Sequence, residues 1–180
     1  MKGRNAVSRL ALISVSGNCK SFAIQSSNYS MIADGNSVKT VSDKDIKKSV
    51  FISQSYDVYT NLALEDWIYK NYDFANHHVL MLWANDPCVV IGRHQNPFEE
   101  TNVSNLLRNG ITLARRNSGG GTVYHDRGNL NCSFFTPRER YNRSYNLNIL
   151  TRALFREWGI KAEISPRDDI TLAGKKVRSA

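Results

Sequence analysis

The segment of the chain best suited to bind an anion contains three consecutive glycines. It reads RRNSGGGTVYHD, and Arg115 and Arg116 stand shortly before the glycines. Glycine lets the backbone approach a ligand closely, and successive N–H groups in such a loop can turn toward an anion. Arginine can also donate two hydrogen bonds to a phosphate. The pattern, which is neither a P-loop nor a dinucleotide fingerprint, indicates an anion-binding loop; the alternative is a flexible hairpin tip beside solvated arginines.

Two other polar clusters are candidates for the same site. Residues 92–96 read GRHQN and follow an apolar segment, which places polar groups at the end of an expected strand. Asn61 and Glu65 are four residues apart and therefore share one face of an expected helix. Taken alone, the first cluster is expected to be an ordinary loop and the second an exposed helix face.

Metal-dependent hydrolysis and serine-nucleophile chemistry find little support in the sequence. His94 and His125 lack partners at metal-ligand spacing, so no metal site is predicted. His125 stands beside Asp126, but a structural role is favoured over a catalytic pair. Ser118 is not within a G-x-S-x-G motif and is expected to shape the loop.

Hydrophobic periodicity and turn residues predict an α/β (α+β) fold. Helices are expected at residues 55–72, 102–109 and 144–158, and strands at 78–84, 88–93, 111–116, 122–126, 130–136, 160–164, 170–172 and 175–177. The strands cluster between the two long helices, and hairpin turns are indicated at 85–87 and 126–129. We therefore expect a mixed, mostly antiparallel sheet flanked by helices.

Charge is distributed unevenly along the chain. The formal net charge is +8, residues 34–107 carry a net −4, and residues 108–180 carry a net +8. A basic second half suits an anionic ligand or an acidic protein partner. Nucleic acid is the rival ligand, but the aromatic residues do not alternate with basic ones as in a stacking platform.

The apolar stretches are too short to span a membrane, and three cysteines without C-x-x-C spacing favour a reducing compartment.

The first 50 residues differ in composition from the rest of the chain. Residues 1–33 contain seven serines and four basic residues but no Asp or Glu, which is typical of a mitochondrial transit peptide. A disordered tail without a targeting role is the alternative. Residues 34–50 are expected to form a linker, and residues 51–180 the catalytic domain, with no part of 1–50 in the fold.

The clusters together resemble the lipoate–protein ligase and lipoyltransferase family. RRNSGGGTVYHD resembles the family motif R-R-x-S-G-G-G-x-V-[FY]-H-D, and the companion motifs NLALEDW, VVIGRHQNP and NLNCSFF occur in the family's order. GKKV near the end is similar to the segment that carries the family's catalytic lysine. RHQNPFEETN followed by LARRNSGGGTVYHD is most similar to the mitochondrial lipoyltransferase branch. The resemblance extends over residues 53–177.

This resemblance implies a fold like that of biotin protein ligase and the class II aminoacyl-tRNA synthetase catalytic domain. It also implies transfer of a lipoyl group from lipoyl-AMP or a lipoyl-protein to a lysine of an acceptor domain, with Lys176 as the catalytic residue. The residues implied to bind the adenylate are Arg116, Gly121, Thr122, Val123, Tyr124 and Arg167. The alternatives are a ligase, which activates free lipoate with ATP and Mg²⁺, and a truncated, non-catalytic form that only binds the adenylate.

The resemblance further implies the partners and the compartment. The expected acceptors are the lipoyl domains of 2-oxo acid dehydrogenase E2 subunits and the glycine cleavage H protein. The protein is expected to be a monomer in the mitochondrial matrix. Neither nucleic acid nor a membrane is expected as a partner. After GKKV the family continues Ser-Gly, then Ser or Thr, then Ala, whereas this sequence reads Arg178-Ser179-Ala180 and stops. We therefore expect the catalytic domain to be incomplete at its C-terminus.

Overall fold

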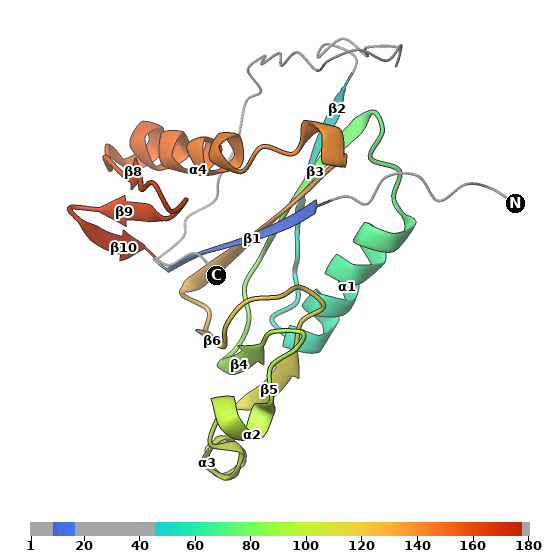
Figure 1. Cartoon of the computed structure of the whole chain (residues 1–180), viewed down its shortest axis with the longest axis vertical. Coiled ribbons are helices and arrows are strands. Elements are labelled where there is room, and N and C mark those ends of the chain that lie inside the picture. The colour runs from blue at the N-terminus through green and yellow to red at the C-terminus, as the bar shows by residue number, and fades with distance from the viewer. Residues whose placement is uncertain (1–8, 17–45, 178–180) are drawn as a thin grey trace, which may run out of the picture.

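The computed structural model describes residues 9–16 and 46–177, and a four-stranded sheet forms its centre (Figure 1). In spatial order its strands are β1 (Arg9–Ser16), β7 (Asn129–Thr136), β3 (His77–Trp83) and β2 (Lys47–Ile52). β7 is antiparallel to both neighbours, whereas β2 runs parallel to β3. The long strand β7 thus has a partner along each edge.

Two small sheets accompany the central one. The first has the order β5 (Thr112–Arg115), β4 (Cys88–Ile91) and β6 (Val123–His125), with β4 parallel to β5 and antiparallel to β6. The second has the order β10 (Lys175–Val177), β9 (Ile170–Leu172) and β8 (Glu163–Ile164), with antiparallel pairs throughout. The expectation of mixed, mostly antiparallel pairing flanked by helices is confirmed, but the strands divide among three sheets.

The helices begin at side-chain caps that the sequence carries. Their bounds are α1 (Val58–Asn71), α2 (Pro97–Glu100), α3 (Val103–Arg108) and α4 (Arg143–Trp158), and a 3-10 turn spans Arg138–Arg140. Asp57 caps α1 by accepting a hydrogen bond from the backbone N–H of Thr60, and Asn102 and Asn142 cap α3 and α4 in the same way. α4 ends at Gly159, whose φ of 67° suits glycine. None of the helices in the described ranges is long and apolar enough to cross a membrane.

Alternating side chains of β3 and β7 build a core on each face of the central sheet. On one face, the strands pack against α4 and the β10–β9–β8 sheet; the buried residues there are Leu80, Leu82, Cys132, Phe134, Leu147, Leu150 and Ile170. On the other face they pack against α1; the buried residues there are Ile68, Phe74, Val79, Met81, Trp83 and Phe135. Figure 1 shows α4 and α1 on opposite sides of β3.

Helix α1 also joins the central sheet to the β5–β4–β6 sheet. Val58 in its first turn is buried with Cys88, Val90 and Ala114, while Ile68 in its third turn packs against the central sheet. One helix therefore fixes the relative position of the two sheets from which the polar clusters of the sequence arise.

Each expected helix and strand from residue 55 onward is present, but the two hairpins are not. β3 and β4 follow each other in the chain yet lie in different sheets, as do β6 and β7. The segment 85–87 does not form a hairpin turn: Asn85 is buried, and the backbone N–H of Asp86 donates to the carbonyl of Tyr56 at 2.8 Å. Turn residues alone could not distinguish a connection between two sheets from a hairpin within one sheet.

The prediction that residues 1–50 take no part in the fold is wrong for two segments. Lys47–Ile52 forms β2 beside β3, and Arg9–Ser16 forms β1 beside β7. The central sheet offers a free edge to each segment, which composition could not reveal. The rest of the expected leader and linker, residues 1–8 and 17–45, lies outside the described residues, and the targeting role stays a prediction.

Candidate functional site

The glycine loop and the GRHQN segment pack directly against each other. A Cβ atom on Gly92 would overlap the carbonyl oxygen of Gly120, so residue 92 has room for glycine only. The backbone N–H of Arg93 donates to the carbonyl of Ser118 at 3.0 Å. Asn117 is tied to α1, since its side-chain amide donates to Asp66 at 2.7 Å. The structure therefore brings two clusters from distant parts of the sequence into one site.

Arg116 lies behind the glycine loop rather than in front of it. Its side chain is among the largest fully buried ones, with 2% exposed. The guanidinium donates to the carbonyls of Val90 at 3.2 Å, Gly119 at 2.9 Å and Gly121 at 2.8 Å. Burial lowers the pKa of Arg116, and the nearby Glu65 opposes that shift. Arg116 thus holds the loop, whereas the sequence favoured a direct contact of this arginine with phosphate.

These bonds orient the loop for an anion. In a trans peptide the C=O and the following N–H point in opposite directions, so drawing the carbonyls of Gly119 and Gly121 toward Arg116 turns the N–H groups of Gly120 and Thr122 away from it. The three glycines are exposed. An exposed loop with outward N–H groups and a buried cation behind it attracts negative charge.

The remaining residues of the loop supply one hydroxyl and an apolar surface. The Thr122 hydroxyl donates to the side-chain oxygen of Gln95 at 2.9 Å. Val123 packs against the core of the β5–β4–β6 sheet, whereas Tyr124 on the other side of β6 is 48% exposed. Tyr124 could therefore cover an aromatic ring or chain of a ligand held at the glycines.

A buried carboxyl group lies beneath the loop on α1. Glu65 is 5% exposed and accepts a hydrogen bond of 2.5 Å from Ser133, which in turn accepts one of 2.9 Å from the indole N–H of Trp83. Burial raises the pKa of Glu65 to about 7, although Ser133 and the positive charge of Arg116 lower it. The expectation of an exposed helix face is therefore wrong at this residue.

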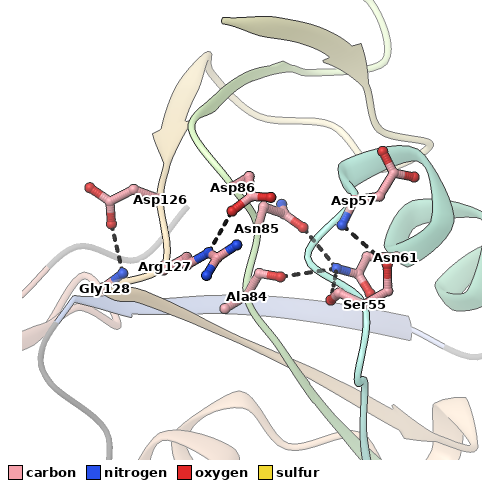
Figure 2. A network of polar contacts seen from close by, with 9 residues as sticks. All are labelled: Ser55, Asp57, Asn61, Ala84, Asn85, Asp86, Asp126, Arg127 and Gly128. Carbon is pink, nitrogen blue, oxygen red and sulfur yellow. Dashed lines mark hydrogen bonds and ion pairs between the residues drawn. The ribbon is translucent and has the colours of Figure 1, made fainter.

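Asn61, the other polar residue of that helix face, is 0% exposed and joins three segments. Its side-chain amide donates to the carbonyls of Ser55 and Ala84, both at 3.0 Å, and to Asn85 at 2.9 Å (Figure 2). The spacing of Asn61 and Glu65 in the sequence was the available signal, but it could not tell a buried face from an exposed one.

His125 continues this network. Because the Asn85 oxygen accepts from Asn61, its amide nitrogen donates to Nδ1 of His125 at 3.0 Å, and the neutral ring carries its proton on Nε2. Burial lowers the pKa of His125 to about 4. His125 is therefore neutral at pH 7, and its structural role stays a prediction. In the part of the chain that the structure describes, no three His, Cys, Asp or Glu side chains are placed so that they could hold a metal ion.

Lys176 and Arg167 belong to the β10–β9–β8 sheet and its turns, not to the sheet that carries the glycine loop. Lys176 lies on β10, and its ammonium is 2.9 Å from the carboxylate of Asp169, which is 17% exposed. Arg167 is exposed in the turn between β8 and β9. Arg116 and residues 121–124 belong to the β5–β4–β6 sheet and its loop, so the expected site residues are divided between two sheets (Figure 1).

Comparison with known proteins identifies the family and the fold. Residues 57–180 match the family model described as the lipoyl protein ligase A/B catalytic domain, which is more than half of the chain. The chain belongs to this family. The resemblance and the fold class expected from the sequence are thereby confirmed.

Relatives in this family are lipoyl amidotransferases and lipoate-protein ligases. Human "Lipoyl amidotransferase LIPT1, mitochondrial" is 51% identical over 112 residues, which are 62% of this chain and 30% of that protein. Lipoate-protein ligase A of Bdellovibrio bacteriovorus is 44% identical over 126 residues, 70% of this chain and 37% of that protein. The chain thus spans about a third of the length of these curated relatives. The human and mouse relatives are named as mitochondrial.

Solved structures of the family share the fold. P. falciparum LipL1 in complex with lipoate gives a TM-score of 0.62 at 32% identity, over 72% of this chain and 42% of that one. Lipoate-protein ligase A bound with ATP gives 0.59 at 27% identity, over 73% of this chain and 58% of that one.

Because the two loops approach each other so closely at Gly92, one added methyl group there should lower the stability of the fold considerably. Gly92→Ala should lower the free energy of unfolding by about 1–3 kcal/mol, because the new Cβ must push Gly120 away. Gly119→Ala is the matched control, since no atom lies within 4 Å of a Cβ there. Urea denaturation of both variants measures the difference. Equal stability of the two variants would contradict the observed packing.

Glu65 predicts a pH-dependent stability. Its folded-state pKa of about 7 exceeds the ordinary 4.5, so the folded protein binds the proton more tightly than the unfolded chain. Its contribution is therefore fully present below pH 4.5 and is lost as pH rises through 7. Relative to Glu65→Gln, the free energy of unfolding should fall by up to about 1.4 kcal/mol per pH unit across this window.

Denaturation curves of both proteins from pH 4 to 8 test this expectation. The comparison with Glu65→Gln cancels the opposite slope from His125, whose pKa is lowered. A difference between the two proteins that stays constant with pH would show that Glu65 is not the titrating group.

Proposed function

We propose that this chain carries the adenylate-binding core of a lipoyltransferase. Such an enzyme moves a lipoyl group from an activated donor, lipoyl-AMP or a lipoyl-protein, to a lysine of an acceptor protein. The observation that carries the proposal is the exposed glycine loop, whose carbonyls at Gly119 and Gly121 are bound by the buried Arg116, in a chain of this family.

The loop suits the single phosphate of an adenylate. The N–H groups of Gly120 and Thr122 would bind the phosphate oxygens, while the buried positive charge of Arg116 would act on them through the loop at short range. Val123 and Tyr124 would supply apolar surface to the rest of the donor. In this proposal Arg116 binds the donor indirectly, through the carbonyls of Gly119 and Gly121.

Lys176 is the proposed catalytic residue. The amine of the acceptor lysine attacks the carbonyl carbon of the mixed anhydride, an amide bond forms, AMP leaves with the electron pair of the broken C–O bond, and the amine proton passes to solvent. Negative charge grows on the carbonyl and phosphate oxygens during this step, and an ammonium group beside them stabilises the transition state more than the ground state. Asp169 would hold Lys176 until the donor binds, and Arg167 would contact the adenylate.

The proposed acceptors are lipoyl domains of 2-oxo acid dehydrogenase E2 subunits and the glycine cleavage H protein, and the proposed compartment is the mitochondrial matrix. The likeness to mitochondrial LIPT1 supports the compartment. A solved neighbour of 25% identity is titled a bipartite lipoate protein ligase "and its E2 lipoyl domain" from Thermoplasma acidophilum, which supports the acceptor class. The protein would act as a monomer.

A ligase that forms its own adenylate is the second candidate. Several relatives are named lipoate-protein ligase A, and one solved neighbour is titled as bound with ATP. Release of pyrophosphate from ATP and Mg²⁺ in the presence of free lipoate would identify this route, whereas a transferase releases none.

The intact mass of an apo acceptor domain, incubated with the protein and lipoyl-AMP, tests the proposed function. A mass increase by one lipoyl group is expected. If this chain binds lipoyl-AMP but leaves the acceptor mass unchanged, it is an adenylate-binding form without transfer, and the proposal is wrong for the chain as given.

Lys176→Ala should lower the transfer rate by at least about 100-fold, as expected for loss of a charge that acts in the transition state. The fold should be unaffected because the side chain is half exposed. Lys175→Ala is the matched control: an exposed lysine that points to the opposite face of the same strand. Equal rates for the two variants, measured by acceptor mass over time, would exclude the role of Lys176.

A further inference from the structure

Gln95 connects the two loops through one side-chain oxygen. Its Oε1 atom accepts the backbone N–H of Gly92 at 2.8 Å and the hydroxyl of Thr122 at 2.9 Å. The orientation of the amide is unambiguous, because a backbone N–H can only donate and must face the oxygen. Gln95 is half-buried, so both bonds are partly shielded from water.

Arg115 fixes the backbone from which Gln95 extends. One nitrogen of its guanidinium, Nη1, donates to the carbonyls of Gly92 at 3.1 Å, Arg93 at 3.1 Å and Gln95 at 2.7 Å. The N–H of Gln95 also closes a turn onto the carbonyl of Gly92 at 3.1 Å. The main chain of Gln95 is therefore held in place independently of its side chain.

Thr122 is the residue on which these contacts converge. The carbonyl that precedes its N–H, that of Gly121, is bound by Arg116, and its hydroxyl is bound by Gln95. The hydroxyl has a second, longer acceptor in the carboxylate of Glu100 at 3.5 Å. Since a hydroxyl has one proton to donate, Gln95 and Glu100 compete for it, and the shorter bond to Gln95 sets the rotamer of Thr122.

We propose that Gln95 is a positioning residue, which holds the backbone N–H of Thr122 in the direction that binds the phosphate of the donor. The proposal rests on the proposed function, because it names how that same loop is kept ready for its ligand. Without the Gln95 oxygen, the Thr122 hydroxyl turns to Glu100, and the loop loses the side-chain hydrogen bond that joins Thr122 to the GRHQN segment.

Two variants separate positioning from general stability. Gln95→Ala removes the acceptor and should weaken binding of lipoyl-AMP roughly tenfold, the equivalent of about one hydrogen bond. Gln54→Ala is the matched control, because Gln54 is an exposed glutamine outside both loops. In a Thr122→Val background, most of the effect of Gln95→Ala on the dissociation constant should disappear, since the hydroxyl through which Gln95 acts is gone. Full additivity of the two substitutions would overturn the proposal.

Amide hydrogen exchange gives a readout that needs no ligand. In the free protein, Gln95→Ala should speed exchange at the N–H of Gly92, which Gln95 binds, and at the N–H of Arg93, which joins this segment to Ser118 of the glycine loop. Gln95→Glu should restore protection because a carboxylate oxygen accepts both bonds. Unchanged exchange in Gln95→Ala, or faster exchange in both variants, would overturn the proposal. If the wild-type chain does not bind lipoyl-AMP, the proposed function fails, and exchange alone still decides whether Gln95 holds the loop.

Discussion

The geometry of the site depends on the buried guanidinium of Arg116. A charge that is 2% exposed costs free energy unless hydrogen bonds replace its hydration, and the carbonyls of Val90, Gly119 and Gly121 do so here. The same bonds shape the glycine loop, because each carbonyl drawn inward turns the next N–H outward. Satisfying the buried cation and presenting N–H groups to an anion are therefore one structural requirement.

Helix α1 couples this loop to the core. It packs against two sheets, and its polar residues Asn61 and Glu65 fill the space between them. Because burial raises the pKa of Glu65 to about 7, this carboxyl is largely protonated in mildly acidic solution, and the charge of Arg116 is then not neutralised. The positive field behind the loop thus depends on how tightly α1 is packed.

Much of the fold and part of the site could be predicted from the sequence. Periodicity and turn residues located the helices, which in the structure are bounded by Asp57, Asn102 and Gly159, and the glycine motif marked the loop. The side on which Arg116 lies could not be predicted, since a guanidinium binds carbonyl and phosphate oxygens alike. Glu65 is bound by Ser133, which is 68 positions away in the sequence, and Gln95 is bound by Thr122, which is 27 positions away. Local spacing cannot indicate either contact.

The amide spectrum of the ¹⁵N-labelled chain during titration with lipoyl-AMP tests most directly whether the loop presents its N–H groups to the phosphate. The account predicts that the resonances of Gly120 and Thr122 shift most, and that they shift in a saturable way. A titration in which these two amides stay in place while signals elsewhere move would contradict it.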